Sequence, residues 1–400
     1  MPSPLEGIRV IEVANYVAGP SAGGLMRDLG ADVIKVEPPG GEVMRGATAG
    51  TIVDNRELPD YLFTLENRGK RSITVDLNIP EGVDFVHELL ATADVLLTNL
   101  ILPRLEKYRL TPAEVHRRNP HVIHVSVTGY GIHGPDAARP AFDFAAFWAR
   151  SGIMGVSGHP GQPPVLSRVA QGDHTTGINA LAATLAALRL RDQTGKGQAV
   201  EVSLQQTGAY TIGTDLSRAL LEARQPPRMD RENPPNPLFN TYETRDGRWL
   251  MIVHMTPDPY WPKLCRALDE PAWAEDPRYS TMRGRREHGT ALFKEIQQRF
   301  RQHDHDHWAR VLDECGLIWA PMVDLPTVIQ DPQLRAMGAF QPVPGPDQFE
   351  TVGVPFYIRD ADIGVRGPMP SPGEDTAAIL GELGISEQRA ADLAALGVFG

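Results

Sequence analysis

The chain has 400 residues, of which 42% are hydrophobic and 22% charged, with a net charge of −11 and a pI near 5.6. This composition is typical of a soluble globular protein, and the length predicts two domains or one large domain with an insertion. The acidic balance and the lack of a long apolar run predict no nucleic-acid partner and no membrane partner. The N-terminus has neither a basic nor an apolar signal region, so we expect a cytoplasmic protein.

Cysteine and histidine usage gives little sign of a metal. Cys265 and Cys315 are too few for a disulfide framework and have no metal-ligand spacing, so we expect buried thiols in a reducing compartment. His303, His305 and His307 alternate in an Asp-rich run, which could bind a metal but is more typical of a solvated helix connection. We therefore expect no metal.

The first half of the chain alternates apolar strands with helical segments. We expect strands over residues 8–13, 32–37, 72–77, 95–99, 122–128 and 199–204, with a helix over 82–92 and another over 178–190. Strands that alternate with helices predict an α/β, Rossmann-like domain around a parallel sheet, in which ligands bind beyond the carboxyl ends of the strands.

Two polar motifs in this half have alternative interpretations. The glycine-rich stretch 19–24 predicts a turn into a helix; it could bind a dinucleotide such as NAD, but its spacing fits helix packing equally well. In the basic run 68–71, Arg68, Lys70 and Arg71 could clamp phosphates at the sheet rim or form a solvated surface. Arg104 and Lys107 form a second basic edge.

Two aspartates precede apolar segments. Asp173 lies between Gly172 and Gly177, just before the helix predicted over 178–190, and an Asp there can cap the helix or do chemistry. Asp143 follows Phe142 and precedes an apolar segment over 144–153, so it is either the N-cap of that segment or a functional group.

The second half of the chain has a different organisation. A proline-rich stretch predicts an extended linker, and strands over 240–243 and 249–254 flank an Asp246-Gly247 turn, which predicts a hairpin. Helices are expected over 260–268, 285–301 and 307–315. The predicted parts are a large domain over residues 1–213, a linker over 214–238, a small α+β domain over 239–320, a linker over 321–335, and a C-terminal part over 336–400 that returns to the large domain.

Several segments along nearly the whole chain form a recognisable series: residues 4–10, 29–37, 67–76, 93–95 with Asn99, 194–197 and 372–376. In this order they resemble the class III CoA-transferases, also called the CaiB/BaiF family. The resemblance implies that Asp173, in its Gly-Asp motif, is the catalytic nucleophile. It also implies that Asp143, with Phe142, supports or gates the active site. The residues implied to contact coenzyme A are Val17, Ala18, Pro20, Glu37, Arg45, Arg71, Asn99 and Lys107.

The resemblance also implies a reaction and an assembly. The enzyme is expected to transfer CoA from an acyl-CoA thioester to a free carboxylic acid through aspartyl anhydride and aspartyl-CoA intermediates, without a metal. Its site must exclude water, because an anhydride would otherwise hydrolyse. The small domain between two linkers fits the family's homodimer, in which two subunits interlock like links of a chain.

Departures from the family pattern restrict the expected chemistry. Formyl-CoA transferase has a Gln in the first turn and a glycine run in its small domain, where this chain has Val17 and the stretch 233–237, so an oxalate or formate role is not expected. Racemases of the family place a His before the loop Asp, where this chain has Phe142. His174 is expected to be structural. The alternatives are a racemase-like or other acyl-CoA enzyme, and a catalytically silent CoA-binding or NAD-binding protein.

Overall fold

The structure is a computed structural model that describes residues 1–46, 58–345 and 349–399. The chain forms two compact units. The large unit contains residues 1–154, 166–223 and 332–400, and the small unit contains residues 155–165 and 224–331.

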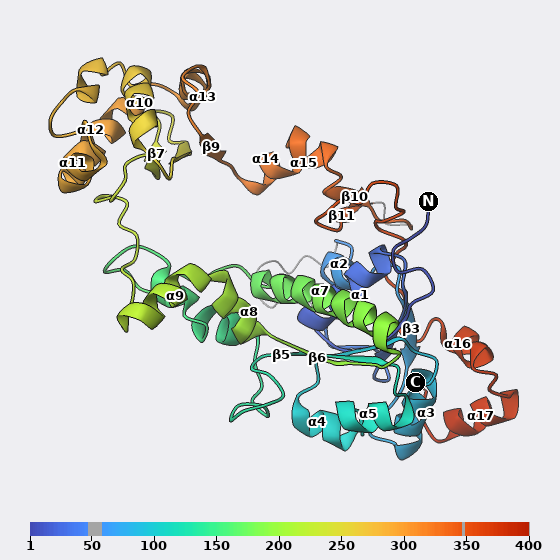
Figure 1. Cartoon of the computed structure of the whole chain (residues 1–400). Coiled ribbons are helices and arrows are strands. Elements are labelled where there is room, and N and C mark those ends of the chain that lie inside the picture. The colour runs from blue at the N-terminus through green and yellow to red at the C-terminus, as the bar shows by residue number, and fades with distance from the viewer. Residues whose placement is uncertain (47–57, 346–348, 400) are drawn as a thin grey trace. The chain divides into compact units, whose positions relative to one another are not determined.

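A six-stranded parallel sheet organises the large unit (Figure 1). Its strands are β1 (Arg9–Val13), β2 (Asp32–Glu37), β3 (Arg71–Thr74), β4 (Val95–Thr98), β5 (Ile123–Thr128) and β6 (Ala199–Ser203). The order across the sheet is β3-β2-β1-β4-β5-β6, and every neighbouring pair is parallel. This is the strand order of a Rossmann fold, so the predicted α/β, Rossmann-like sheet is confirmed.

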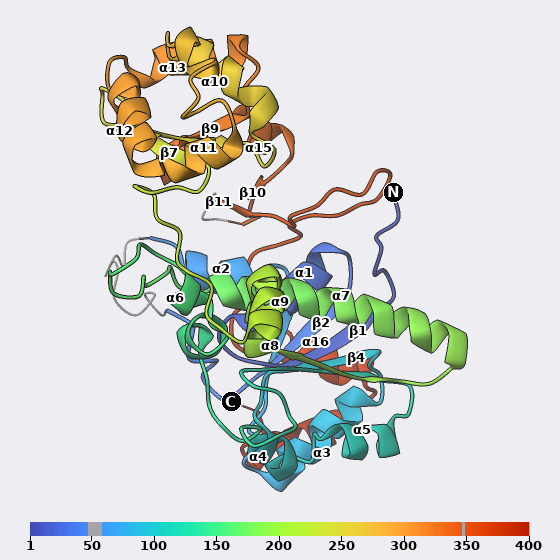
Figure 2. The same cartoon turned by 60° about the vertical axis from the view of Figure 1, so that its left-hand side comes forward.

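Helices cover both faces of this sheet, because successive strand residues point to opposite sides. In β4, Val95 and Leu97 belong to the core with α1 and α7, whereas Leu96 belongs to the core with α3, α4 and α5. Figure 2 shows these two helix layers. The helices are α1 (Ala18–Asp28), α2 (Tyr61–Asn67), α3 (Pro80–Leu90), α4 (Leu102–Lys107), α5 (Pro112–Arg118), α7 (Gln171–Thr194), α8 (Leu204–Thr211) and α9 (Gly213–Glu222).

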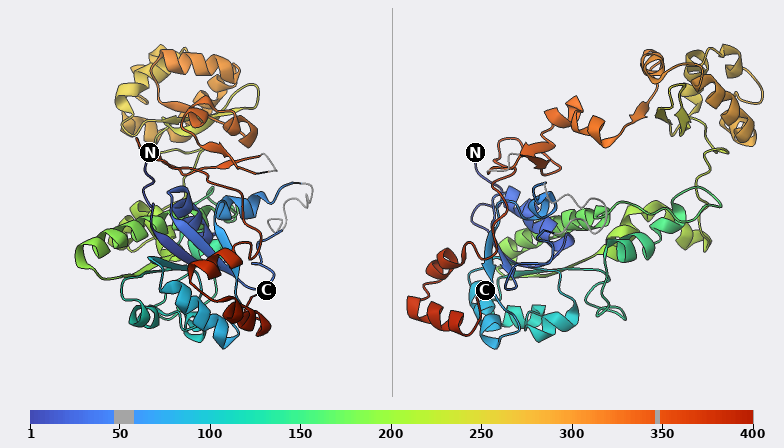
Figure 3. Two further views of the ribbon diagram at one scale, coloured as in Figure 1. Left: turned by 90° about the vertical axis from the view of Figure 1, so that its right-hand side faces the viewer. Right: turned by 180° about the vertical axis from the view of Figure 1, so that it is seen from behind.

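The C-terminal segment completes the second layer. Helices α16 (Thr376–Glu382) and α17 (Glu387–Ala395) lie beside α3 (Figure 3), and Ile379 and Leu393 join the core on that side. The rings of Phe85 and Phe399 meet edge-on with centroids 5.0 Å apart. The remaining elements of the large unit are a π-helical segment (Phe144–Ala149), α15 (Pro332–Ala336), β10 (Phe340–Pro342) and β11 (Glu350–Val352). A short helix, α6 (Ile153–Val156), lies where the two units meet in sequence.

The small unit is an antiparallel sheet packed against helices. The predicted hairpin is confirmed, because Glu243 pairs with Trp249 across an antiparallel register. Tyr242, Trp261 and Phe300 are fully buried in its core. Its elements are β7 (Phe239–Glu243), β8 (Trp249–Val253), β9 (Trp319–Met322), α10 (Trp261–Ala267), α11 (Met282–Glu287), α12 (Gly289–Phe300), α13 (His305–Glu314), α14 (Leu325–Ile329) and short 3-10 turns at Asp258–Tyr260 and Pro271–Ala274.

Three expectations about local structure are wrong. The single helix predicted over 285–301 is divided into α11 and α12 at Gly289, where a Cβ would lie 2.9 Å from the Pro234 carbonyl oxygen. Pro321, expected in a linker, lies in the edge strand β9, a position that tolerates proline because one side of the strand is unpaired. The glycine-rich stretch 19–24 lies inside α1 instead of forming a turn before it. A Cβ on Gly24 would lie 2.7 Å from the Glu66 carbonyl oxygen, so the glycine permits close packing of α1 and α2.

Candidate active site

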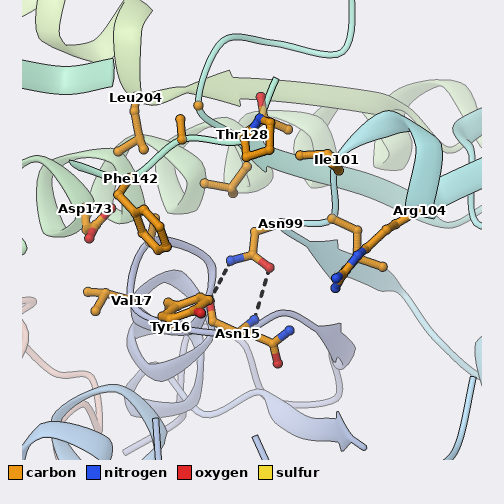
Figure 4. Close-up of a pocket in the computed structure, with 16 residues that line it drawn as sticks. Asn15, Tyr16, Val17, Asn99, Ile101, Arg104, Thr128, Phe142, Asp173 and Leu204 are labelled. Carbon is orange, nitrogen blue, oxygen red and sulfur yellow. Dashed lines mark hydrogen bonds between the residues drawn. The ribbon is translucent and has the colours of Figure 1, made fainter. Parts of the chain in front are cut away.

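A cavity of about 260 Å³ opens at the carboxyl ends of β1, β4 and β5 (Figure 4). The strand order reverses between β1 and β4, and open α/β sheets bind ligands at such a switch point. All of its lining residues belong to the large unit. They are Asn15, Tyr16, Val17, Ala18, Asn99, Leu100, Ile101, Arg104, Val127, Thr128, Gly129, Pro140, Ala141, Phe142, Asp173 and Leu204.

Asp173 enters this cavity from the first turn of α7. The helix begins at Gln171, earlier than predicted, and its N-cap is Ala170, which has a left-handed φ of 67°. No side chain caps this helix, so Asp173 is not its cap, and no described residue donates a hydrogen bond to its carboxylate. Burial and the negative charge of Asp143 raise the pKa of Asp173 to about 7, although His174 opposes the shift.

Asp143 lies behind the start of α7. It is buried, and neither of its oxygens has a hydrogen-bond partner among the described residues, so its side chain does not cap the following helical segment. A Cβ on Gly172 would clash with Asp143 Oδ1, which shows how closely the carboxylate approaches the helix. Burial raises the pKa of Asp143, against the smaller effects of nearby N–H groups and His174. Asp143 therefore adds negative charge beside Asp173.

Phe142 and Tyr16 border the cavity near Asp173 (Figure 4). Phe142 is 61% exposed, and its ring meets that of Tyr16 edge-on with centroids 5.3 Å apart. Tyr16 has a left-handed φ of 63°, an unusual conformation for a residue with a side chain. The two rings, from loops more than a hundred residues apart, together form an aromatic edge to the cavity.

Asn99 uses its side chain to fix the loop after β1. Its Oδ1 accepts a hydrogen bond from the Asn15 N–H at 3.0 Å, and its Nδ2 donates to the Asn15 carbonyl oxygen at 2.6 Å. Figure 4 shows this amide at the centre of the lining residues. Val17, at the end of the same loop, and Ala18, the first residue of α1, line the cavity, so the structure brings these three predicted CoA contacts together with Asp173.

Other predicted CoA contacts lie at a neighbouring cavity of about 120 Å³. Glu37 lines it and accepts hydrogen bonds from Arg45 at 2.7 and 2.6 Å. Lys107 Nζ donates to the Oδ1 of Asn78, another residue that lines this cavity, at 2.7 Å. Glu37, Arg45 and Lys107 therefore lie along the same edge of the sheet as the larger cavity.

The structure does not bring Pro20 or Arg71 to either cavity. Pro20 is buried inside α1, where its carbonyl oxygen accepts a hydrogen bond from Lys70 at 2.9 Å. Arg71 begins β3 at the opposite, amino edge of the sheet and pairs with Asp32 at 3.1 Å and Glu382 at 2.6 Å.

The rest of the basic run is also internal. Arg68 pairs with Asp28 at 2.6 Å and Lys70 with Glu12 at 2.7 Å, and all four side chains are buried. Both interpretations of the run are therefore wrong for Arg68 and Lys70, which are neither solvated nor free to hold a phosphate.

Three further residues line these cavities: Arg104, which the sequence indicated only as part of a basic edge, and Thr128 and Asn15, which were not predicted. Arg104 is exposed, lines both cavities, and has no side-chain partner among the described residues. Thr128 and Asn15 line the larger cavity. Asn15 and Thr128 lie just after, or at the end of, a strand of the parallel sheet, whose carboxyl edge binds ligands, and Arg104 lies in the helix that follows β4.

His174 forms an ion pair with Glu66 of α2, with 2.8 Å between His174 Nε2 and Glu66 Oε1. Burial alone lowers the pKa of His174, but the hydrogen bond and charge of Glu66, together with the charges of Asp173 and Asp143, outweigh burial and raise it. The imidazole beside Asp173 is thus stabilised as a cation.

Metal ligands and membrane spans do not occur in the part of the chain that the structure describes. Within residues 1–46, 58–345 and 349–399, no three His, Cys, Asp or Glu side chains gather as metal ligands would. None of the helices in these ranges has both the length and the apolar character needed to cross a membrane.

Comparison with known proteins identifies the family. Residues 5–376 match the profile of CoA-transferase family III. The chain is 32% identical over 390 residues to (R)-2-hydroxy-4-methylpentanoate CoA-transferase from Clostridioides difficile, with 96% of each chain covered. It is 32% identical over 392 residues to succinate–glutarate CoA-transferase from Agrobacterium fabrum, with 97% of each covered.

A solved structure agrees with these matches. The crystal structure of a CAIB/BAIF family protein from Brucella suis superimposes with a TM-score of 0.84 at 33% identity, over 96% of this chain and 100% of that one. The chain therefore belongs to CoA-transferase family III.

Proposed function

We propose that this enzyme transfers CoA from an acyl-CoA thioester to a free carboxylic acid, with Asp173 as the nucleophile. The observation that carries the proposal is a carboxylate without a hydrogen-bond donor among the described residues, facing a cavity at the switch point of a Rossmann sheet. Membership of CoA-transferase family III supports CoA as the transferred group. Relatives named for branched hydroxy acids and for dicarboxylates show that the acid varies within the family.

The proposed cycle uses the Asp173 carboxylate twice. It attacks the thioester carbonyl, so that a carbon–oxygen bond forms and the carbon–sulfur bond breaks; CoA leaves as a thiolate, and a mixed anhydride of Asp173 and the acyl group remains. The thiolate then attacks the aspartyl carbonyl, releases the first acid as a carboxylate, and leaves an aspartyl-CoA thioester. The incoming carboxylate reverses these steps and departs as the new CoA ester. The first N–H groups of α7, which have no intrahelical acceptor, supply hydrogen bonds for the oxyanions.

We further propose that CoA lies along the carboxyl edge of the sheet. Val17 and Ala18, where the loop braced by Asn99 enters α1, would lie against the pantetheine, since these residues line the cavity that holds Asp173. Arg104 and Lys107 are exposed cations near the second cavity, and they suit the phosphates of CoA. Glu37, which lines the second cavity, and Arg45, which is hydrogen-bonded to it, would lie beside these phosphates. Asp143 and Phe142 would support and border the reacting carboxylate.

The proposed assembly is an interlocked homodimer in the cytoplasm. Each subunit would have a large domain over residues 1–213, linkers over 214–238 and 321–335, a small domain over 239–320, and a returning segment over 336–400. Helix α9 is evidence for a surface that contacts the partner subunit, because none of its residues is buried and Leu220 and Leu221 are 86% and 88% exposed.

A transfer assay with a matched pair of variants tests the function. Wild-type protein is mixed with an acyl-CoA and a panel of carboxylic acids, and new CoA esters are detected by mass spectrometry. We expect Asp173→Asn to lose at least about a thousandfold in transfer rate, because an amide is a poor nucleophile. Asp192→Asn, an exposed position on the same helix, should keep the wild-type rate. Full activity of the Asp173→Asn variant contradicts the proposal.

A further inference from the structure

The His174–Glu66 ion pair lies next to the proposed nucleophile but has no part in the cycle described above. Glu66 is almost fully buried in α2, whereas the His174 side chain is 42% exposed. Their contact at 2.8 Å joins two segments 108 residues apart. A buried carboxylate needs a charged or hydrogen-bonded partner, and His174 supplies both.

Close helix packing fixes the two partners. Gly24 of α1 lets the Glu66 backbone approach, because a Cβ there would lie 2.7 Å from the Glu66 carbonyl oxygen. Gly177 of α7 likewise lets Ser21 of α1 approach, because a Cβ there would clash with the Ser21 hydroxyl. Helix α1 therefore sets the positions of both α2 and α7, and with them the geometry of the ion pair.

The charges around this pair are unbalanced. The negative charges of Asp143, at the start of the π-helical segment, and of Glu66, in α2, both raise the pKa of Asp173 in α7. The charges of all three carboxylates raise the pKa of His174, which contacts Glu66 directly. Arg68 lines the same small cavity as His174 and Glu66, but its guanidinium pairs with Asp28 at 2.6 Å. The other elements that border this cavity contribute Ser21, Leu25, Ile178, Val352 and Pro355, which carry no charge.

We propose that the Glu66–His174 pair is a positioning device that holds a protonated imidazole beside Asp173 and so keeps the nucleophile ionised for attack. This inference rests on the proposed role of Asp173. A carboxylate grouped with two others would otherwise take up a proton, and a protonated acid does not attack a thioester. Glu66 is needed because a half-buried imidazole loses its proton more readily without an anionic partner. His174 itself does not touch the reacting atoms in this mechanism.

The pH dependence of transfer tests the pair. In kcat/KM profiles, His174→Gln should move the acidic limb to higher pH, because Asp173 loses the neighbouring cation. If the limb moves by about one pH unit, the rate on that limb falls tenfold, so we expect roughly a tenfold loss at pH 6 and little change at pH 9. Glu66→Gln removes a charge that itself raises the pKa of Asp173, but it also lets His174 lose its proton. Because His174 affects Asp173 more strongly than Glu66 does, the limb should move in the same direction by a smaller amount, and the double variant should lose less than the product of the single losses. His174→Lys, which restores a cation, should recover part of the rate at pH 6.

A control and a direct titration separate this role from a structural one. His133, which also lies near a glutamate at 3.6 Å but is 84% exposed and lines neither cavity, provides the control variant His133→Gln, whose profile should match the wild type. NMR titration of His174 should show a lower pKa in the Glu66→Gln variant than in the wild type, a readout that does not need the His174 variants to fold.

The outcomes distinguish two failures. If the Glu66→Gln titration and the His174→Gln profile both match the wild type while Asp173→Asn is inactive, the positioning role is wrong and the proposed function stands. If Asp173→Asn retains full transfer activity, the proposed function itself fails.

Discussion

At the scale of single residues, burial and neighbouring charge decide what Asp173 can do. The sequence showed an Asp between glycines and could not separate a helix cap from a catalyst, because both need the same residue at a helix start. The structure places the cap at Ala170 and leaves the Asp173 carboxylate without a donor among the described residues, beside buried Asp143. A carboxyl group without a hydrogen-bond donor and beside a second carboxylate costs free energy to ionise, and such costs are often found at functional sites.

This cost predicts a pH-dependent gain in stability for Asp173→Asn. The folded-state pKa, about 7, lies above the unfolded value of about 3.9, so the folded protein binds more protons between these pH values. Its free energy of unfolding therefore falls as pH rises from about 4 to 7. The variant cannot ionise at this position, so it should be more stable than the wild type by about 1–3 kcal/mol at pH 8 and by little at pH 4.

Thermal unfolding followed by circular dichroism at the two pH values measures this difference. Asp192→Asn serves as the control and should unfold like the wild type at both, because Asp192 is exposed. Equal melting temperatures of wild type and Asp173→Asn at pH 8 would count against a partly buried carboxylate that is costly to ionise.

The partners of the buried cations could not be predicted from sequence. Arg68 and Lys70 read as a basic surface run because their neighbours in sequence are polar. Their carboxylate partners, Asp28 and Glu12, lie 40 and 58 residues away. Only the pairing of β1, β2 and β3 and the packing of α1 bring these charges together, so local sequence gives no sign that the run is internal.

At the scale of elements, the parallel strands were the most predictable part. Strands buried on both faces read as continuous apolar runs, and five of the six lie within one residue of their predicted ends. For β3, the prediction extended to residue 77, whereas the strand ends at Thr74. The starts of α1 and α7 were misplaced, because the glycines there serve contacts with distant segments instead of ending the helices.

The contact between α1 and α7 gives a prediction about packing. Gly177→Ala adds a methyl group that clashes with the Ser21 hydroxyl, and overpacking of this kind costs about 1–3 kcal/mol. Ser21→Ala removes the clashing oxygen and leaves the next atoms, including the Ala18 carbonyl oxygen, at 3.2 Å. The double variant should therefore be more stable than Gly177→Ala alone.

Chemical denaturation of the wild type and the three variants measures the coupling between the two positions. Gly195→Ala is unsuitable as a control because Gly195 has a positive φ, whereas Gly381→Ala in α16, where a Cβ meets no atom within 4 Å, is a suitable one. If the double variant is no more stable than Gly177→Ala, the close approach of the two helices at this point is wrong.

At the scale of the whole molecule, the order of the strands in the sheet determines which loops line the cavity with Asp173. The loops after β1 and β4 diverge at the switch point, so Asn15 to Ala18 and Asn99 to Ile101 line one cavity with Asp173 from α7. The sequence predicted the Rossmann-like core and the family, and the family match over residues 5–376 confirms the latter. The sequence did not predict that Arg71 lies at the amino edge of the sheet. Arg71 is the first residue of β3, and the exact start of a strand decides at which edge such a residue lies.

The most direct test of the central claim is to trap the covalent intermediate on Asp173. The protein is incubated with an acyl-CoA, treated with hydroxylamine or borohydride, digested, and mapped by mass spectrometry. We predict a hydroxamate or a reduced side chain at Asp173 that requires acyl-CoA and is absent from Asp173→Asn. Transfer activity with an unmodified Asp173, or with the label on another residue, would contradict the proposed mechanism.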